Sequence, residues 1–394
     1  MDVTDTPRVA DRRAVGVRAA EGPPRSPAVR LLRDRSHEVD PQNVYMGRSA
    51  LDARGPAARQ PWFEWWYYKA VVPATGEAIF AAYGVVNPTD VAGRSGASQA
   101  FLIFGAPRRK LLLVERLPVR SFEASSSSTY VRVGRSHATA CRAVGEVAGQ
   151  GHRARWDLGF ATRWRFPATG WVSWFPAASN IHWHPAQADA RVSGVVELDG
   201  ERLELVGAPG YQDHNWGSSF PRYWLWIACN TFADAPETAL VVGGGLPRAM
   251  RRVEVGSVVC VGLRHEGRVH AFRSTDLHGT RVEPLPGGWR VEASDGRRRI
   301  TVEARAPLEA FLPIELDTPD GGRFVNYETL AGDLQVRLEE RSRVLRWRKV
   351  VELSSRQAGL EIGLDARRAP TSLWQRCLGR EPALAPGRAL AVAP

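Results

Sequence analysis

The predicted fold depends on one aromatic-rich stretch, Gly210-Tyr211-Gln212-Asp213-His214-Asn215-Trp216-Gly217-Ser218-Ser219-Phe220-Pro221-Arg222-Tyr223-Trp224-Leu225-Trp226-Ile227-Ala228-Cys229-Asn230. Gly210, Gly217 and Pro221 favour a turn over residues 211–220, after which the side chains alternate as in a β-strand. One face of this strand would carry Trp224, Trp226, Ala228 and Asn230, and the other Tyr223, Leu225, Ile227 and Cys229. Because neither face is dominated by charge, we expect both to be covered. A strand of this kind, entered through a loop that holds Asp213 and His214, suits the floor of an apolar pocket.

Short alternating segments continue on both sides of this stretch. Residues 62–72 and 77–86 form the first predicted hairpin, and Asp199-Gly200 marks the turn of another. Helical periodicity is weak along the whole chain. Strands that recur about every 8–12 residues, with frequent turns between them, are typical of sandwiches and barrels. The sequence therefore predicts an all-β fold with few short helices.

Two similar segments suggest that the chain is built from two halves. Pro61-Trp62-Phe63-Glu64-Trp65-Trp66 and Pro221-Arg222-Tyr223-Trp224-Leu225-Trp226 both place an aromatic strand after a proline, about 160 residues apart. Two homologous barrel-like halves would explain this similarity, and so would chance in a chain with 14 tryptophans. Barrels of this size hold one apolar ligand in their interior. We predict a disordered N-terminal extension over 1–40, β halves over 41–215 and 216–366, and a flexible basic tail over 367–394.

The net charge of the chain is strongly positive, at +11, yet it does not predict nucleic-acid binding. Arginine supplies nearly all of the positive charge, since only three of the 53 basic residues are lysines. Scattered arginines are typical of a solvated surface, and we expect no nucleic-acid partner. The positive charge is densest at Arg341, Arg343, Arg346, Arg348 and Lys349. A strand face with these residues would suit anionic lipid headgroups, so peripheral membrane contact is left open.

The cysteines and the apolar runs predict the compartment. Cys141, Cys229, Cys260 and Cys377 are too widely spaced for a disulfide framework, so reduced thiols are expected. No apolar run approaches the roughly 18–20 residues that a membrane-spanning helix needs. Acidic residues near the N-terminus argue against a signal or transit peptide. Together these features predict a cytoplasmic protein, with membrane association left open.

The stretch 210–230 resembles the signature of the tocopherol cyclase family, in which an acidic and a basic residue precede Asn-Trp-Gly, Phe-Pro and an aromatic strand. Phe63-Glu64-Trp65-Trp66-Tyr67-Tyr68-Lys69 is similar to the opening motif of that family. The resemblance covers roughly residues 60–360. It implies two lipocalin-like halves and a distant likeness to carotenoid 1,2-hydratases. Further matches follow in the order of the family at Asn87-Pro88, 99–105, Gly170 to Pro176, His182-Trp183 and Gly243-Gly244-Gly245-Leu246.

The resemblance implies a reaction that needs no redox cofactor. An acid protonates a trisubstituted alkene on a prenyl tail, and a phenol oxygen captures the tertiary cation to close a ring. Asp213 matches the acidic position of the family, where glutamate is usual, and His214 stands where lysine is usual. Burial among Tyr211, Trp216 and Trp224 would raise the pKa of Asp213 and keep it protonated, while a charged His214 would oppose that shift. An Asp-Asn turn without chemistry is the alternative.

Glu64, His182 and several aromatic residues complete the predicted site. Glu64 is the second candidate acid, or the partner that orients one, and a structural carboxylate is the alternative. His182 matches a family position and would manage the counter-proton. His182 and His184 have a spacing that metal sites use, but no further ligand lies near them in sequence and no metal is predicted. Indoles would flank the cation at about 2 kcal/mol per contact, or simply form the core. The predicted substrate-binding residues are Tyr211, Asn215, Trp216, Trp224, Trp226, Asn230, Trp62 and Trp66.

The sequence thus leads to three candidate functions. The first is a cofactor-independent cyclase that closes a ring on a hydrophobic small molecule, either a prenylated aromatic compound or a terpenoid. The second is a hydratase that adds water to the same kind of cation, and the third is a lipocalin-like carrier that binds a prenyl lipid without turnover. Trp65 stands where a glycine is usual in the family, and its indole would narrow the pocket. We therefore expect a substrate different from the tocopherol precursor.

Overall fold

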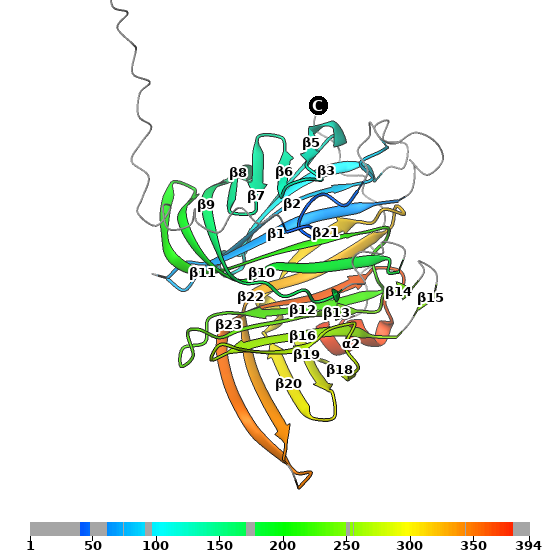
Figure 1. The fold of residues 1–394 in the computed structure, drawn as a ribbon. Helices are drawn as coiled ribbons and strands as arrows, with labels where there is room; N and C mark the ends of the chain where they lie inside the picture. The colour runs from blue at the N-terminus through cyan, green and yellow to red at the C-terminus, as the bar shows by residue number, and fades with distance from the viewer. Residues whose placement is uncertain are drawn as a thin grey trace, which may run out of the picture.

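The computed structural model describes residues 40–47, 61–73, 75–90, 97–170, 178–249, 253–254, 256–342 and 344–380. Two curled antiparallel β-sheets dominate it (Figure 1). The prediction of an all-β, lipocalin-like fold with two halves and few short helices is confirmed. The predicted N-terminal extension lies outside the described residues, except for Asp40. The described helices are the 3₁₀-helices η3 (Pro107–Arg109), η4 (Val119–Ser121) and η6 (Leu308–Ala310), and the α-helix α2 (Thr371–Leu378).

Eleven strands form the first sheet, and each strand pairs with the next along the chain except at one opening. The opening lies between β4 and β5, while the last strand, β11, returns to pair with β1. The sheet therefore curls around an interior of its own. Its strands are β1 (Phe63–Val71), β2 (Ala78–Val86), β3 (Gln99–Ala106), β4 (Leu111–Leu117), β5 (Phe122–Ala124), β6 (Tyr130–Val133), β7 (Ser136–Thr139), β8 (Arg142–Gly149), β9 (His152–Trp164), β10 (Ile181–Leu198) and β11 (Glu201–Gly217).

Ten strands form the second sheet on the same plan. The opening lies between β17 and β18, and the last strand, β23, returns to pair with β12. The first strands β1 and β12, which carry the two similar aromatic segments, thus have equivalent places in their sheets. The strands are β12 (Tyr223–Cys229), β13 (Ala239–Gly245), β16 (Val258–His265), β17 (Arg268–Phe272), β18 (Gly279–Leu285), β19 (Gly288–Ser294), β20 (Arg298–Arg305), β21 (Leu312–Asp317), β22 (Arg323–Arg341) and β23 (Trp347–Asp365), beside a separate ribbon of β14 (Arg248–Ala249) and β15 (Val253–Glu254).

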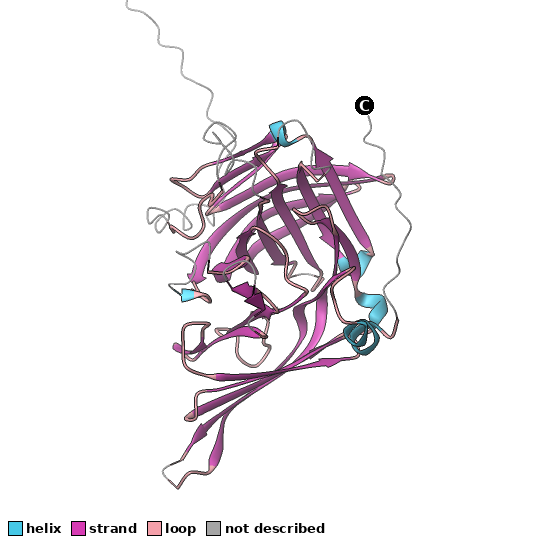
Figure 2. Ribbon diagram, turned by 90° about the vertical axis from the view of Figure 1, so that its right-hand side faces the viewer, coloured by secondary structure: helices cyan, strands magenta, loops and turns pink. Residues whose placement is uncertain are grey.

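Three apolar clusters fill the space within and between the sheets. One cluster is drawn from the first sheet and the segment before it, and a second from the second sheet, its connections and α2, so each curled sheet has a packed interior. The third cluster combines residues of both sheets, which are stacked on each other in Figure 2. The alternation predicted for β12 is confirmed, because Trp224 and Trp226 belong to the third cluster while Leu225 and Ile227 belong to the second.

The prediction of a turn over residues 211–220 is wrong for residues 211–217. β11 continues through Gly217 because each residue from Gly210 to Gly217 has a partner on β1. The chain leaves the first sheet after Gly217, whereas the first half was predicted to end at residue 215. It enters β12 at Tyr223. Asp213 and His214 are therefore consecutive strand residues, whose side chains point to opposite faces.

The tail predicted to be flexible from residue 367 includes the helix α2. This helix buries Trp374, Cys377 and Leu378 against the core of the second sheet, so the prediction is wrong for 371–378. The reason is an amphipathic pattern of apolar residues that a Pro- and Arg-rich composition concealed. Residues 381–394 lie outside the described residues. All four cysteines are free, as predicted.

The strands β22 and β23 are each 19 residues long and end in a hairpin that projects from the second sheet (Figure 1). Arg341, Arg346, Arg348 and Lys349 are exposed there, and Arg343 lies outside the described residues. Membrane contact at these residues stays a prediction, as does the cytoplasmic location. Within the described ranges, no helix has the length and apolar character that crossing a membrane requires.

Candidate active site

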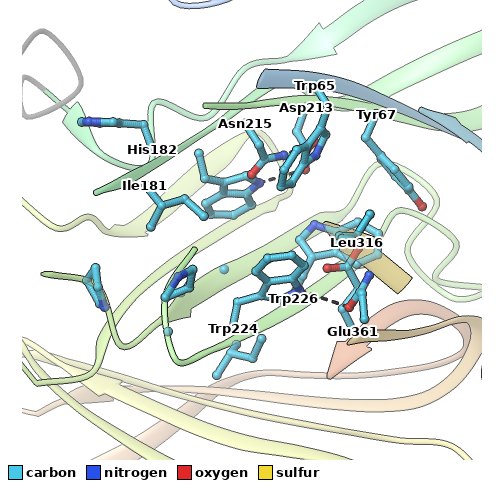
Figure 3. A pocket seen from close by; sticks show the side chains of 18 of the residues that line it. Trp65, Tyr67, Ile181, His182, Asp213, Asn215, Trp224, Trp226, Leu316 and Glu361 are labelled. Atoms are coloured by element: carbon cyan, nitrogen blue, oxygen red, sulfur yellow. Dashed lines mark hydrogen bonds between the residues drawn. The ribbon is translucent and has the colours of Figure 1, made fainter. Parts of the chain in front are cut away.

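A cavity of about 300 Å³ lies between the two sheets (Figure 3). Strands β1, β2, β3, β10 and β11 contribute to it from the first sheet, and β12, β13, β16, β21, β22 and β23 from the second. The expectation of a ligand inside a barrel does not fit this structure, because the interior of each sheet is filled by its own side chains. The aromatic residues that line the cavity are Trp65, Tyr67, Phe80, Phe101, Trp183, Trp224 and Trp226.

Asp213 lines this cavity and is held by three hydrogen-bond donors. Trp183 Nε1 donates to Asp213 Oδ2 at 2.8 Å, and the hydroxyl of Tyr211 donates to the same oxygen at 2.7 Å. Asn215 Nδ2 donates to Oδ1 at 2.9 Å. Burial raises the pKa of Asp213 to about 6, and the three hydrogen bonds and the charge of His214 oppose that rise. At neutral pH this carboxyl group is therefore mostly ionised.

The alternation of β11 explains why Asp213 faces the cavity. Side chains of Tyr211, Asp213 and Asn215 lie on the side toward the second sheet, and those between them lie on the opposite side. Tyr211 OH also accepts a hydrogen bond of 3.1 Å from Trp226 Nε1. The indole of the second sheet thus orients the tyrosine, which in turn orients the carboxyl group of the first sheet.

Two further carboxyl groups line the same cavity, those of Glu328 on β22 and Glu361 on β23. The two residues are directly opposite each other in the β22–β23 pairing, so their side chains are neighbours on one face of the sheet. The hydroxyl of Tyr67 donates a hydrogen bond of 2.6 Å to Glu328 Oε1. Asn326 and Trp224 lower the pKa of Glu361, and Trp224 Nε1 donates a hydrogen bond of 3.1 Å to Asn326 Oδ1. Glu328 is 2% exposed, while Glu361 is partly accessible from the cavity that it borders.

The environment of this pair favours the protonated carboxyl group. Burial raises the pKa of Glu328 to about 8, although the hydrogen bond from Tyr67 and the charge of Lys69 oppose the rise. Burial, followed by repulsion from Glu328 and Asp213, raises the pKa of Glu361 well above its usual range. The cavity therefore holds one carboxyl group with a pKa of about 6 and a neighbouring pair whose pKa values are both raised, that of Glu328 to about 8. Environments that separate pKa values in this way are a mark of acid–base sites.

The sequence of β23 explains why Glu361 has room in the cavity. Gly359, Glu361 and Gly363 occupy one face, while aliphatic residues between them pack into the core of the second sheet. A Cβ atom at Gly359 would lie 2.5 Å from the ring of Trp226, and one at Gly363 would lie 2.4 Å from the indole nitrogen of Trp224. The glycines thus allow the two indoles to lie across β23 on either side of Glu361.

Comparison with known proteins places this chain in a family. A family model described as tocopherol cyclase-like matches residues 136–364, which is more than half of the chain. The chain belongs to the tocopherol cyclase-like family. It is 25% identical over 358 residues to a probable chloroplastic tocopherol cyclase of Oryza sativa subsp. japonica, with 77% of this chain and 76% of the relative covered. It is also 25% identical over 364 residues to a chloroplastic tocopherol cyclase of Zea mays, with 77% and 75% covered.

Two solved structures are similar at lower identity. The crystal structure of CghA with Sch210972 has a TM-score of 0.49 and 13% identity, covering 78% of this chain and 89% of that one. The crystal structure of kievitone hydratase from Nectria haematococca has a TM-score of 0.47 and 11% identity, covering 77% and 88%.

In this member of the tocopherol cyclase-like family, His214 and Glu64 lie away from the cavity. They face the interior of the first sheet, where His214 Nε2 and Glu64 Oε1 are 2.9 Å apart and both side chains are fully buried. Glu64 also accepts hydrogen bonds from the backbone amides of residues 46–47 and from Trp62 Nε1, at 2.7 to 2.9 Å. This arrangement fastens the segment 40–47 to the first sheet, as in the structural alternative considered for Glu64.

Some of the tryptophans predicted to bind substrate lie at the cavity, and others lie on the opposite side of the first sheet. Trp224 and Trp226 line the cavity, whereas Trp66 stacks on His214 with ring centroids 4.5 Å apart, inside the first sheet. Trp216 stacks on the rings of His214 and His182 at 4.6 and 5.3 Å. The ring of His182 points away from the other cavity residues in Figure 3, although the residue borders the cavity. These stacked rings form a layer on the face of β11 opposite to that of Asp213.

Asn230 has a structural position at the junction of the two sheets. Its Nδ2 donates to Asp189 Oδ1 at 2.9 Å and to the carbonyl oxygen of Gly210 at 2.8 Å. The residue does not line the cavity. Of the predicted substrate-binding residues, the cavity contains Asn215, Trp224 and Trp226, with Tyr211 as a support for Asp213.

The sequence reasoning missed Glu328, Glu361 and their partner Tyr67. A signal for Glu361 was present, since Gly-Leu-Glu-Ile-Gly-Leu over residues 359–364 alternates a carboxyl group with glycine on one face and aliphatic residues on the other. Residues 326–330, Asn-Tyr-Glu-Thr-Leu, contain no glycine and gave no comparable signal for Glu328. A carboxyl group on the small-residue face of a buried strand indicates a cavity beside that strand.

Proposed function

We propose that the chain is an enzyme that closes a ring on a prenylated aromatic compound or a terpenoid. An acid in the cavity protonates an alkene of the substrate, and an oxygen of the same molecule captures the resulting tertiary cation. Membership of the tocopherol cyclase-like family supports this class of reaction. Each step moves a proton or a lone pair, so the chemistry transfers no electrons to or from a cofactor.

The observation that carries this proposal is the combination of carboxyl groups and indoles in one apolar cavity. A carboxyl group that holds its proton at neutral pH is a general acid for whatever fills the cavity. The indoles of Trp65, Trp183, Trp224 and Trp226 present π faces and no nucleophile. They would stabilise a cation by about 2 kcal/mol per desolvated contact without capturing it. A carrier would need the apolar walls but not the buried acids, whose burial lowers stability.

The size of the cavity suggests a compact substrate. Its volume of about 300 Å³ lies at the lower end of the range for ligand pockets, about 300–1,000 Å³. Trp65 occupies part of the space between the sheets, with its ring centroid 4.9 Å from that of Phe63 and 6.1 Å from that of Trp224. We therefore propose a substrate with a shorter prenyl tail than the tocopherol precursor.

Incubation of the purified protein with prenylated quinols of increasing tail length, and with terpenoid alcohols, tests this function. Conversion without a change of mass, with one deuterium in a new C–H bond when the solvent is D₂O, is the expected result. A product that has gained one water would favour the hydratase, and a bound lipid that stays unchanged would favour the carrier. Heat-denatured protein controls for cyclisation by the buffer. Failure to convert any compound that the protein binds would contradict the proposal.

A further inference from the structure

We infer that the Glu328–Glu361 pair donates the proton to the substrate alkene, and that Asp213 accepts the proton that the capturing hydroxyl group loses. This assignment rests on the proposed cyclisation and gives opposite roles to the two sides of the cavity. The first sheet supplies the base, and the second sheet supplies the acid. It differs from the sequence-based prediction, in which Asp213 is the donor.

The first argument is the geometry of the pair. Glu328 and Glu361 are direct cross-strand partners, both line the cavity, and neither forms an ion pair within the described part of the chain. Two carboxyl groups held side by side in an apolar site cannot both carry a negative charge without strong repulsion. At least one proton therefore stays on the pair, next to the space that the substrate fills.

The hydrogen bonds of Glu328 permit a neutral carboxyl group. Within the described residues, the side chain of Glu328 has a hydrogen bond from the Tyr67 hydroxyl, which donates to Oε1 and leaves Oε2 able to carry a proton. A tyrosine hydroxyl both donates and accepts, so this contact persists in either protonation state. Glu361 lies between the indoles of Trp224 and Trp226, where a cation formed by protonation would be flanked by π faces.

The hydrogen bonds of Asp213 favour the carboxylate instead. Trp183 and Asn215 reach it through N–H groups that only donate. The Tyr211 hydroxyl also donates to Asp213, while its oxygen accepts the N–H of Trp226. Oδ2 thus has two donors and Oδ1 has one, which leaves Oδ1 as the oxygen that can receive a proton from the substrate.

The proton and electron balance of the reaction is complete with these groups. The reaction starts with both carboxyl groups of the pair protonated. One O–H bond breaks, the alkene π electrons form a C–H bond to that proton, and the pair is left with one negative charge. A lone pair of the substrate oxygen then forms the C–O bond, and the O–H proton moves to Asp213. After the product leaves, Asp213 loses its proton to solvent and the pair regains one, so the net reaction is an isomerisation.

Charged or titratable groups on three other strands act on Glu328. Glu361 faces it from β23, Tyr67 and Lys69 act on it from β1, and Asp213 acts on it from β11. Lys69 is fully buried, and burial lowers its pKa, so it is a weak counter-charge. The negative charge of Asp213 opposes loss of the proton by Glu328 in the resting enzyme.

The test compares Glu328→Gln, Glu361→Gln and Asp213→Asn with Glu352→Gln, a matched control on the exposed part of β23. The substrate is whichever prenylated quinol the wild-type enzyme converts. We expect kcat to fall by about 10²–10⁴-fold in the three cavity variants, with KM changed little, and to stay unchanged in the control.

The wild-type profile of kcat/KM against pH should fall on the alkaline side near pH 8, where the pair loses its proton. It should fall on the acid side near pH 6, where Asp213 gains one.

The two limbs of that profile separate the roles. The alkaline limb should disappear in Glu328→Gln or Glu361→Gln and remain in Asp213→Asn, which should lose the acid limb instead. If Asp213→Asn removes the alkaline limb and the glutamine variants keep it, the assignment is overturned and Asp213 is the donor. If the variants have profiles like that of the wild type, the pair takes no part in the chemistry.

A second measurement does not depend on turnover. Infrared difference spectra between pH 7 and pH 9 should show loss of the C=O stretching band of a neutral carboxylic acid, and this band should be weakened in Glu328→Gln or Glu361→Gln but not in Glu352→Gln. Absence of the band in the wild type overturns the inference even if the enzyme is a cyclase. Presence of the band together with no conversion of any substrate overturns the proposed function and its catalytic roles, while the protonation of the pair stands.

Discussion

The raised pKa of Glu328 predicts how the stability of the protein depends on pH. An unfolded glutamate loses its proton near pH 4.5, whereas the folded Glu328 keeps its proton up to about pH 8. Between these values the folded state binds one more proton than the unfolded state, so the free energy of unfolding falls as the pH rises. The stabilisation is complete below pH 4.5 and is lost as the pH passes through 8.

The size of this effect follows from the interval between the two pKa values. About 3.5 pH units separate 4.5 from 8, and each unit corresponds to about 1.4 kcal/mol. Glu328 therefore accounts for a fall on the order of 5 kcal/mol in the free energy of unfolding between pH 4.5 and pH 8. Substitution with glutamine removes the titration while keeping the oxygen that accepts the hydrogen bond from Tyr67.

Urea unfolding at several pH values from 5 to 8 measures this difference. We expect the free energy of unfolding of the wild type to fall steeply as the pH rises, and that of Glu328→Gln to fall less. The stability of the variant relative to the wild type should therefore increase by several kcal/mol from pH 5 to pH 8. Glu352→Gln, an exposed site, should run parallel to the wild type. Parallel curves for Glu328→Gln and the wild type would show that Glu328 ionises normally, and the reasoning about the cavity acids would fail.

Three further predictions concern other contacts. Glu64→Ala should reduce the free energy of unfolding by about 3–5 kcal/mol, because the change leaves Nε2 of the buried His214 imidazole and three N–H donors unpaired; a loss below about 1 kcal/mol in urea unfolding contradicts this. Gly243→Ala should displace the indole of Trp183, since the new Cβ would lie 2.5 Å from it. Loss of that donor should raise the pKa of Asp213, which is seen as an upward shift of the acid limb of kcat/KM; an unmoved limb counts against the contact. Trp65→Gly should enlarge the cavity and raise kcat/KM for long prenyl tails relative to short ones by about tenfold or more, and an unchanged ratio would refute the role of this indole.

Local sequence patterns were sufficient to predict much of the fold. Alternation in β12 correctly separated Trp224 and Trp226 from Leu225 and Ile227, because a strand turns successive side chains to opposite faces whatever its surroundings. The hairpin at Asp199-Gly200 was also predictable, since both residues have positive φ angles, 50° and 88°, that such short polar residues and glycine adopt readily. The extent of β11 was not predictable, because its last eight residues depend on pairing with β1, far away in the chain.

The sequence by itself determined which side chains of β12 share a face and that the chain is all-β in two halves. Only the tertiary structure decided which face of each strand borders the cavity. Aromatic and polar residues occur on both faces of β1 and β11, so periodicity alone does not distinguish the filled interior of a sheet from the space between sheets. The meeting of Asp213, Glu328 and Glu361 depends on how the two sheets curl and stack, because these residues come from strands that are distant in sequence and contact the same space only through long-range pairing.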